Sequence, residues 1–200
     1  LEFRSEGDLN FNALSSGKNV YLRASSTVYT GPGVGGDAVN GLTTLGTFRV
    51  AANTTATFNS RNGFGLTFGG AWTQESSNNV NTITNNMGGT LTFTGNAWNN
   101  NDGTARTLTI GGNGNTVITG SINSSGAGVK TLTKSGTGSL TIQGIATTLD
   151  GAVNIQGGAV TITDFRSLNN NSATINIGSG GTAGALIIGS GVTPTVAGLT

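Results

Sequence analysis

The chain has 200 residues, of which 35 are glycine, 33 threonine, 24 asparagine and 17 serine, whereas only 8% are charged and the formal net charge is +1. Glycine, threonine and asparagine disfavour helix interiors, so the composition excludes a mainly helical fold and favours short β-strands. The scattered basic residues exclude the positive stripe that attracts nucleic acid, and no apolar run is long enough for a membrane-spanning helix. Cysteine and histidine are absent, which excludes disulfides, thiolate metal sites and imidazole-based catalysis.

Residues 1–60 are expected to form an atypical N-terminal β region that is continuous with the repeats of residues 61–200. Within it, residues 31–36 (GPGVGG) contain the spacing G-x-G-x-x-G of dinucleotide-binding turns. Pro32 interrupts this spacing, and no helix follows that could receive a phosphate at its N-terminus. We therefore expect a loop at this place and no nucleotide cofactor.

From Thr90 onwards, short segments place apolar residues two positions apart, with threonine or another polar residue between them. Residues two apart share one face of a β-strand, so the apolar residues are predicted to point inward and the threonines outward. The predicted inward pairs are Leu91 with Phe93, Leu108 with Ile110, Leu140 with Ile142, Val153 with Ile155, Val160 with Ile162, and Ile175 with Ile177.

Corresponding segments return after roughly 17 to 24 residues, a period typical of a β-solenoid, in which each short strand pairs with its equivalents in neighbouring coils. The matched positions are Leu91 with Leu108, Leu132 with Val153, Leu140 with Val160, and Val153 with Ile175. We therefore predict an all-β fold, a parallel β-helix with coils of roughly 20 residues. Asn-Gly pairs at Asn40, Asn62 and Asn113 leave a β-sandwich with hairpins open as an alternative.

Two segments interrupt this rhythm, residues 74–89 and residues 95–103. Both are rich in asparagine or glycine and are predicted to be loops that leave the coils. Trp72 and Trp98 lie in or beside these loops, and we interpret each indole as closing over the core, with sugar or partner contact as the alternative. The possible contact residues are Trp72, Trp98, Asn99 and Asn100.

No metal or cofactor is expected from the sequence. Residues 111–118 (GGNGNTVI) resemble the calcium-binding nonapeptide of toxin β-rolls, but Thr116 stands where the aspartate ligand belongs, which favours a structural turn. Paired carboxylates could cleave a glycosidic bond without histidine. Each of the candidates Asp102, Asp150 and Asp164 lies in a turn or at a strand end, where aspartate commonly caps the backbone. A β-helix enzyme would need two acids to meet Arg106 or Arg166 in one groove.

Outward threonines recur along the predicted strands, among them Thr92, Thr109, Thr133, Thr141, Thr161 and Thr163. Regular Thr-x-Thr ladders on a solenoid can order water against ice. Threonine also has high strand propensity, and uneven coil spacing is expected to spoil a flat lattice of hydroxyls. The sequence is therefore interpreted as an ordinary exposed β surface.

The clearest repeat lies between residues 132 and 162. Residues 132–142 read Leu-Thr-Lys-x-Gly-x-Gly-Ser-Leu-x-Ile, and residues 151–162 read Gly-x-Val-x-Ile-x-Gly-Gly-x-Val-x-Ile. This pattern resembles the passenger-associated repeat of bacterial autotransporters. The resemblance implies a right-handed parallel β-helix at the surface of a Gram-negative cell, and a repeat that supports export and stacking but supplies no catalytic residue. The structural repeat positions are Leu132, Gly136, Gly138, Leu140, Ile142, Gly151, Val153, Ile155, Gly158, Val160 and Ile162.

The functional expectation is a non-enzymatic extracellular or cell-surface β-solenoid, acting as a stalk, an adhesin scaffold or a self-assembling fibre, and part of a longer chain. The alternatives are a polysaccharide-active β-helix enzyme and a phage or other fibre that binds cell-surface glycans. The expected partners are further copies of the chain, the rest of a longer parent chain, or a surface glycan or protein. Nucleic acid and a direct membrane span are not expected.

Overall fold

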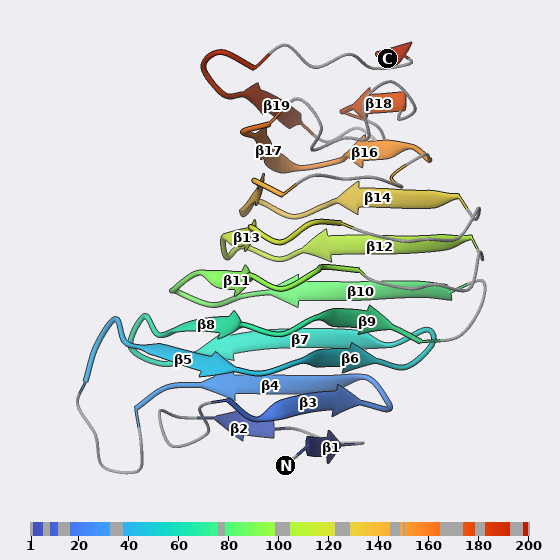
Figure 1. Ribbon diagram of the computed structural model, residues 1–200. Coiled ribbons are helices and arrows are strands. Elements are labelled where there is room, and N and C mark those ends of the chain that lie inside the picture. Colours follow the sequence, from blue (N-terminus) through green and yellow to red (C-terminus); the bar gives the residue numbers. More distant parts are fainter. Residues whose placement is uncertain are drawn as a thin grey trace.

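The computed structural model describes residues 2–5, 9–11, 17–32, 38–75, 79–98, 105–122, 129–144, 149, 151–164, 174–178, 183–192 and 198–199. These residues contain 20 strands and no helix, and the strand pairs among them are all parallel. The strands stack in successive coils along one axis, with the N-terminus at one end and the C-terminus at the other (Figure 1). The prediction of an all-β, parallel β-solenoid is confirmed.

Three parallel sheets form the sides of the solenoid. The four-stranded sheet contains β1 (Glu2–Ser5), β3 (Asn19–Leu22), β6 (Phe48–Val50) and β9 (Trp72–Gln74). The nine-stranded sheet contains β2 (Leu9–Phe11), β4 (Ser26–Thr30), β7 (Thr55–Ser60), β10 (Asn79–Asn85), β12 (Arg106–Gly111), β14 (Lys130–Lys134), β16 (Val153–Ile155), β18 (Thr174–Ile177) and β20 (Gly198–Leu199). The seven-stranded sheet contains β5 (Leu42–Leu45), β8 (Gly65–Phe68), β11 (Leu91–Phe93), β13 (Thr116–Ile118), β15 (Ser139–Ile142), β17 (Gly158–Ile162) and β19 (Gly184–Ile188).

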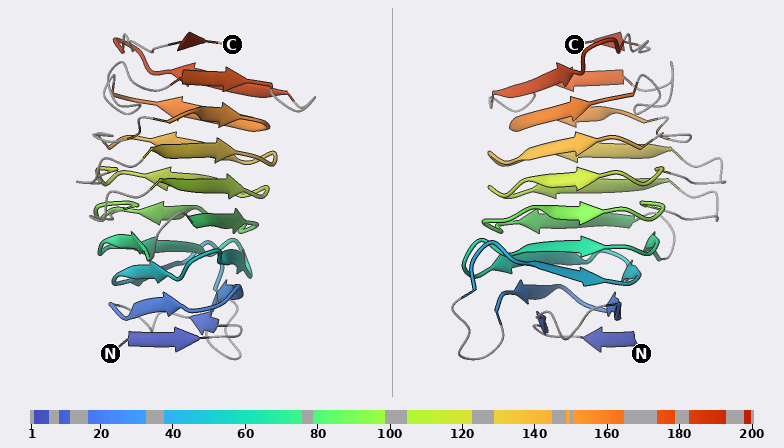
Figure 2. Two further views of the ribbon diagram at one scale, coloured as in Figure 1. Left: turned by 90° about the vertical axis from the view of Figure 1, so that its right-hand side faces the viewer. Right: turned by 60° about the vertical axis from the view of Figure 1, so that its left-hand side comes forward.

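The N-terminal coils visit the three sheets in turn, as β6, β7 and β8 do. Beyond β9, the line of the four-stranded sheet continues as a single bridge between Ala97 and Ile122. Successive coils keep nearly the same strand directions from one end of the stack to the other (Figure 2). The strands before residue 60 pair with those after it, as β5 does with β8, so the same sheets run through both parts of the chain.

The register agrees with three of the four predicted matches and contradicts one. Leu132 pairs with Val153, Leu140 with Val160, and Val153 with Ile175. The match of Leu91 with Leu108 is wrong, because β11 lies in the seven-stranded sheet and β12 in the nine-stranded sheet. Strands of both sheets have the same alternating pattern. Two strands within one coil therefore look, in the sequence, like equivalent strands of two successive coils.

The predicted loop over residues 74–89 is also wrong, because β10 (Asn79–Asn85) runs through its middle. Asparagines take inward positions of this strand, and Asn81 and Asn85 are buried. The amide of Asn81 donates to the carbonyl oxygens of Ala51 and Thr54 at 2.8 and 3.1 Å. Hydrogen bonds to backbone carbonyls make asparagine acceptable inside the solenoid, although its polarity hides the strand from a search for apolar alternation.

The Asn-Gly pairs form coil corners rather than hairpins. Asn40 and Asn62 have left-handed φ values of +53° and +51° in the turns that precede β5 and β8, where the chain enters the seven-stranded sheet. Asparagine tolerates this conformation better than most residues. Asn113 lies in the turn between β12 and β13, which belong to different sheets. The β-sandwich alternative does not fit the parallel pairing of the described strands.

The core is a continuous column of inward side chains that changes character along the axis. In the N-terminal half it is aromatic: the ring centroids of Phe48 and Phe68 lie 4.7 Å apart, those of Phe68 and Phe93 5.5 Å, and those of Trp72 and Phe93 4.7 Å. In the C-terminal half it is aliphatic and includes the buried residues Leu108, Ile110, Ile118, Leu132, Leu140, Ile142, Val153, Ile155, Val160 and Ile162. Burial of this column against the coils above and below supplies the main stabilisation of the stack.

Glycines stack at the corner between the seven-stranded sheet and the line of the four-stranded sheet. A Cβ atom at Gly120 would lie 1.8 Å from the carbonyl oxygen of Gly95, and one at Gly144 would lie 1.9 Å from that of Gly120. Such distances leave no space for any side chain. The corner therefore requires glycine in each of these successive coils.

Candidate functional site

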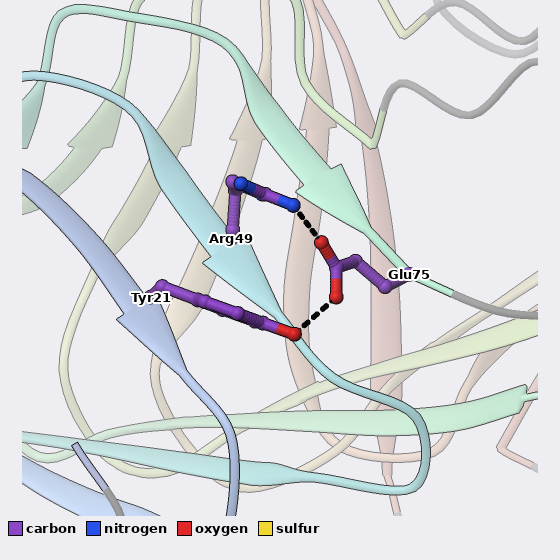
Figure 3. A network of polar contacts seen from close by, with 3 residues as sticks. All are labelled: Tyr21, Arg49 and Glu75. Carbon is purple, nitrogen blue, oxygen red and sulfur yellow. Dashed lines mark hydrogen bonds and ion pairs between the residues drawn. The ribbon is translucent and has the colours of Figure 1, made fainter. Parts of the chain in front are cut away.

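An outward-facing polar cluster crosses three coils of the four-stranded sheet (Figure 3). Tyr21 lies on β3, Arg49 on β6, and Glu75 directly follows β9. The Tyr21 hydroxyl donates to Oε2 of Glu75, and Nη2 of Arg49 donates to Oε1 of the same carboxylate. The Arg49 guanidinium carbon also lies 4.8 Å from the centroid of the Tyr21 ring, in cation–π geometry.

The electrostatics of the cluster keep the phenol protonated. The hydrogen bond to Glu75 raises the pKa of Tyr21 above its ordinary value, with smaller contributions from burial and from the Glu75 charge. The side chains of Arg49 and Glu75 are 40% and 25% exposed, so solvent screens their ion pair.

The cluster holds one carboxylate, and both of its oxygens accept hydrogen bonds. A glycosidase needs a pair of carboxyl groups flanking the bond. The arrangement is therefore suited to joining three coils rather than to acid–base chemistry. The sequence did not predict this cluster because successive members are 28 and 26 residues apart. Such spacings indicate neighbouring positions only once the coil length is known.

The predicted repeat residues lie at the interior and at the corners of the C-terminal coils. Gly136 has a φ of +71°, and a Cβ atom at Gly138 would lie 2.1 Å from the carbonyl oxygen of Gly114 in the preceding coil. Gly158 also has a positive φ, of +62°, and a Cβ atom at Gly151 would lie 2.6 Å from the Lys130 carbonyl oxygen. The apolar repeat residues Leu132, Leu140, Ile142, Val153, Ile155, Val160 and Ile162 are all buried.

Three cationic side chains lie inside the solenoid, which the sequence analysis did not anticipate. Arg106, Lys130 and Lys134 are 3%, 1% and 1% exposed, and all three occupy inward positions of β12 and β14. In register, Lys134 lies between Ile110 and Ile155. An alternating strand fixes this outcome, because Leu132 can face the core only if residues 130 and 134 do so as well.

Lys134 satisfies its ammonium group locally. Its Nζ donates to the carbonyl oxygens of Ser135 and Gly136 at 2.5 and 3.2 Å, at the turn that follows β14. Burial lowers the pKa of Lys134 to about 8. The lysine of the repeat motif therefore hydrogen-bonds, from the core side, the turn that follows its own strand.

The residues proposed for the enzyme alternative do not assemble in the described part of the chain. Arg106 is buried on an inward position of β12, so its side chain is not part of an outer groove. Asp164 follows β17 and is half-buried. Asp102, Asp150 and Arg166 lie outside the described residues.

Both tryptophans are core residues rather than surface contacts. Trp72 and Trp98 are each 1% exposed, and the Trp98 indole nitrogen donates to the side-chain oxygen of Gln74. The rings are therefore not accessible to a sugar or a partner, in agreement with the interpretation that they close over the core. Asn99 and Asn100 lie outside the described residues.

The calcium-like turn at residues 111–118 is held by the preceding coil. The amide of Asn85 donates to the Asn115 carbonyl oxygen at 2.8 Å and to Thr116 Oγ1 at 3.2 Å, and both Asn85 and Thr116 are buried. In the part of the chain that the structure describes, no group of three or more acidic residues is placed to hold a metal ion. Of the G-x-G-x-x-G spacing, residues 33–36 lie outside that part.

Comparisons with known proteins leave the chain without an assigned family. No family model matches it, and neither the curated proteins nor the solved structures contain a significant match. No helix in the described residues has the length and apolar character needed to cross a membrane. The fold and the geometry of its surfaces therefore carry the functional argument.

Proposed function

We propose that the protein is a non-enzymatic structural β-solenoid that acts as a rigid spacer at a cell surface or outside the cell. The observation that carries this proposal is the unbroken stacking of strands in one direction. The nine-stranded sheet pairs each of its strands with the next along the whole axis, and the core column beneath it is continuous. A stack of this kind resists bending because displacing one coil breaks its pairing with two neighbours.

The resemblance to autotransporter passenger repeats supports a surface location, with export and stacking as the role of the repeat. That location is part of the proposal. The buried repeat residues and the corner glycines fit a motif whose residues serve stacking.

Among the described strands, one edge of β19 has no paired strand. Ile188 continues the inward column of Ile142 and Ile162, yet it is 46% exposed, and no described strand pairs with the far edge of β19. An additional coil, from a second copy or from a longer parent chain, would bury this residue and pair the edge. We propose end-to-end stacking on β19 as the mode of assembly.

The rigidity can be measured by double electron–electron resonance between two spin labels, because the chain contains no cysteine of its own. Thr44 and Ile187 lie in one column of the seven-stranded sheet, six strand steps apart. At about 4.8 Å per step, labels on T44C/I187C are expected about 29 Å apart, with a single narrow distribution. The pair T44C/T161C spans one strand step fewer, so its mean label–label distance should be shorter by about 4.8 Å. A broad or multiple distribution would refute the rigid spacer.

Assembly is tested separately by light scattering over a range of concentrations. End-to-end stacking predicts mass that rises with concentration, and Ile188→Lys should suppress the rise because it places a charge on the exposed end of the core. A monomer at every concentration would remove the self-assembly proposal and leave the spacer proposal intact.

A further inference from the structure

The nine-stranded sheet presents a regular array of threonines to solvent. Four consecutive strands, β7, β10, β12 and β14, each carry an outward Thr-x-Thr pair. We call this surface the threonine face; its residues are Thr55, Thr57, Thr82, Thr84, Thr107, Thr109, Thr131 and Thr133. All eight side chains are half-buried, since each is flanked by neighbours on the same strand and in adjacent coils.

The strand register aligns these threonines in columns. One column crosses all four coils and contains Thr55, Thr82, Thr109 and Thr133. Shorter columns lie on either side, one formed by Thr57 with Thr84 and the other by Thr107 with Thr131. The face is therefore a two-dimensional grid rather than a single ladder.

The expectation that uneven coil spacing spoils such a lattice is wrong for this sheet. Successive members of the long column are 27, 27 and 24 residues apart, yet they remain direct partners in the parallel register. The differences in length are taken up between the strands. Loop length and lattice regularity are thus independent in a solenoid, because pairing fixes each strand relative to its neighbours.

The grid has spacings that suit an ordered water surface. Neighbouring strands are about 4.8 Å apart, and outward residues two apart on one strand are separated by about 6.7 Å. These repeats are close to the oxygen spacings along two perpendicular axes of hexagonal ice. The strands of successive coils stay nearly parallel, so the grid keeps its direction across the four coils (Figure 2).

The face is also free of charge among its described outward side chains. The cations of β12 and β14, namely Arg106, Lys130 and Lys134, point into the core, and the remaining outward residues of the four strands include only neutral side chains such as Asn59 and Val80. A neutral surface lacks charge complementarity with phosphates or acidic polysaccharides. None of the described outward side chains of these strands is aromatic, although aromatic rings are the usual platform for sugars.

We propose that the threonine face binds ice. The hydroxyl groups would hydrogen-bond a layer of water in register with the grid, while the methyl groups between them limit alternative water arrangements. That layer would then join the surface of an ice crystal, and the adsorbed protein would hinder growth of the crystal. The proposal does not depend on the spacer function, since it requires only the geometry of β7, β10, β12 and β14.

The test measures thermal hysteresis and inhibition of ice recrystallisation for the purified chain and two lysine variants. Thr109→Lys places a charged side chain in the centre of the grid. Thr141→Lys is the matched control, because Thr141 lies outward on β15 in a column of the seven-stranded sheet that Val117 interrupts. Circular dichroism melting of all three proteins monitors the fold, and Thr82→Lys serves as a second grid variant if Thr109→Lys melts early.

The expected result is activity in the wild type and in Thr141→Lys, and loss of most of it in both grid variants at unchanged fold. Wild-type protein that neither shapes ice nor slows recrystallisation would overturn the proposal, as would equal effects of Thr109→Lys and Thr141→Lys. Binding of the purified chain to crystalline cellulose is measured in a pull-down as a further test. Binding to cellulose together with no effect on ice would assign the face to a polysaccharide and overturn the proposal.

Discussion

Replacing Lys134 with methionine tests whether a buried cation weakens the solenoid at neutral pH. Methionine keeps the length of the aliphatic stem and packs between Ile110 and Ile155 without a charge. The ordinary pKa of lysine is 10.5, and burial lowers that of Lys134 to about 8 in the folded protein. At about 1.4 kcal/mol per unit, this difference corresponds to about 3 kcal/mol of folding free energy.

The sign of the pH dependence follows from proton binding in the two states. Between pH 8 and pH 10.5 the unfolded chain keeps the Lys134 proton that the folded chain has released. The stability of the wild type should therefore rise with pH across this window, and the cost of the charge should be fully present below pH 8. Lys134→Met should be more stable than the wild type at pH 7 by up to about 3 kcal/mol, reduced by the free energy of the two hydrogen bonds that Nζ makes in the wild type. This difference in stability should shrink as pH rises.

Urea unfolding followed by circular dichroism at pH 7.0, 8.5 and 9.5 measures this difference directly. Lys18→Met, on a half-buried lysine before β3, is the matched control for replacing a lysine by methionine. Staying below pH 10 avoids ionisation of Tyr21, whose pKa is raised. A wild type and Lys134→Met that change in parallel from pH 7.0 to 9.5 would refute the assignment of a desolvated ammonium group at this position.

Three further changes probe the core, the corners and the polar cluster. Leu140→Ala, at a fully buried position of β15, should cost about 2 to 5 kcal/mol and lower the melting temperature, and an unchanged melt would contradict its place in the core. Gly138→Ala should destabilise the fold more than Gly69→Ala, because the new Cβ meets a carbonyl oxygen at 2.1 Å at the first position and at 3.5 Å at the second; similar thermal melts would argue against the close coil contact. Glu75→Gln should lower the pKa of Tyr21 in an ultraviolet titration and cost no more than about 1 kcal/mol in urea unfolding, whereas an unchanged titration would show that Glu75 does not hold the phenol.

The sequence predicts the coils well where one alternating pattern dominates. Leu140 and Ile142 are separated by one threonine and followed by a turn, and the same arrangement returns at Val160 and Ile162, so pairing of these segments can be inferred without coordinates. Leu91 shows the limit of the method. Each coil beyond β9 holds two strands of similar composition, and nothing local distinguishes the next strand of the same coil from the equivalent strand of the next coil.

Polar interior residues account for most of what the sequence did not predict. β10 is hidden because Asn81 and Asn85 take inward positions, where hydrogen bonds to carbonyl oxygens of neighbouring coils replace apolar contacts. The Tyr21 cluster is hidden for another reason, since its three residues lie on three coils whose lengths cannot be read from the poorly repeating N-terminal region. Hydrogen-bond partners between coils depend on register, and register is a property of the folded stack.

The stacked corner glycines determine how such a protein can change in length. Because Gly120 and Gly144 each meet the backbone of the coil before, a coil inserted between these two is expected to need a glycine at the same place. Arg106 pairs with Lys130 and Thr116 with Leu140, both at an offset of 24 residues, so one repeat of these two coils is 24 residues long. Duplication or loss of such repeats changes the length of the rod in steps of about 4.8 Å, whereas indels of one or two residues are confined to the connecting loops.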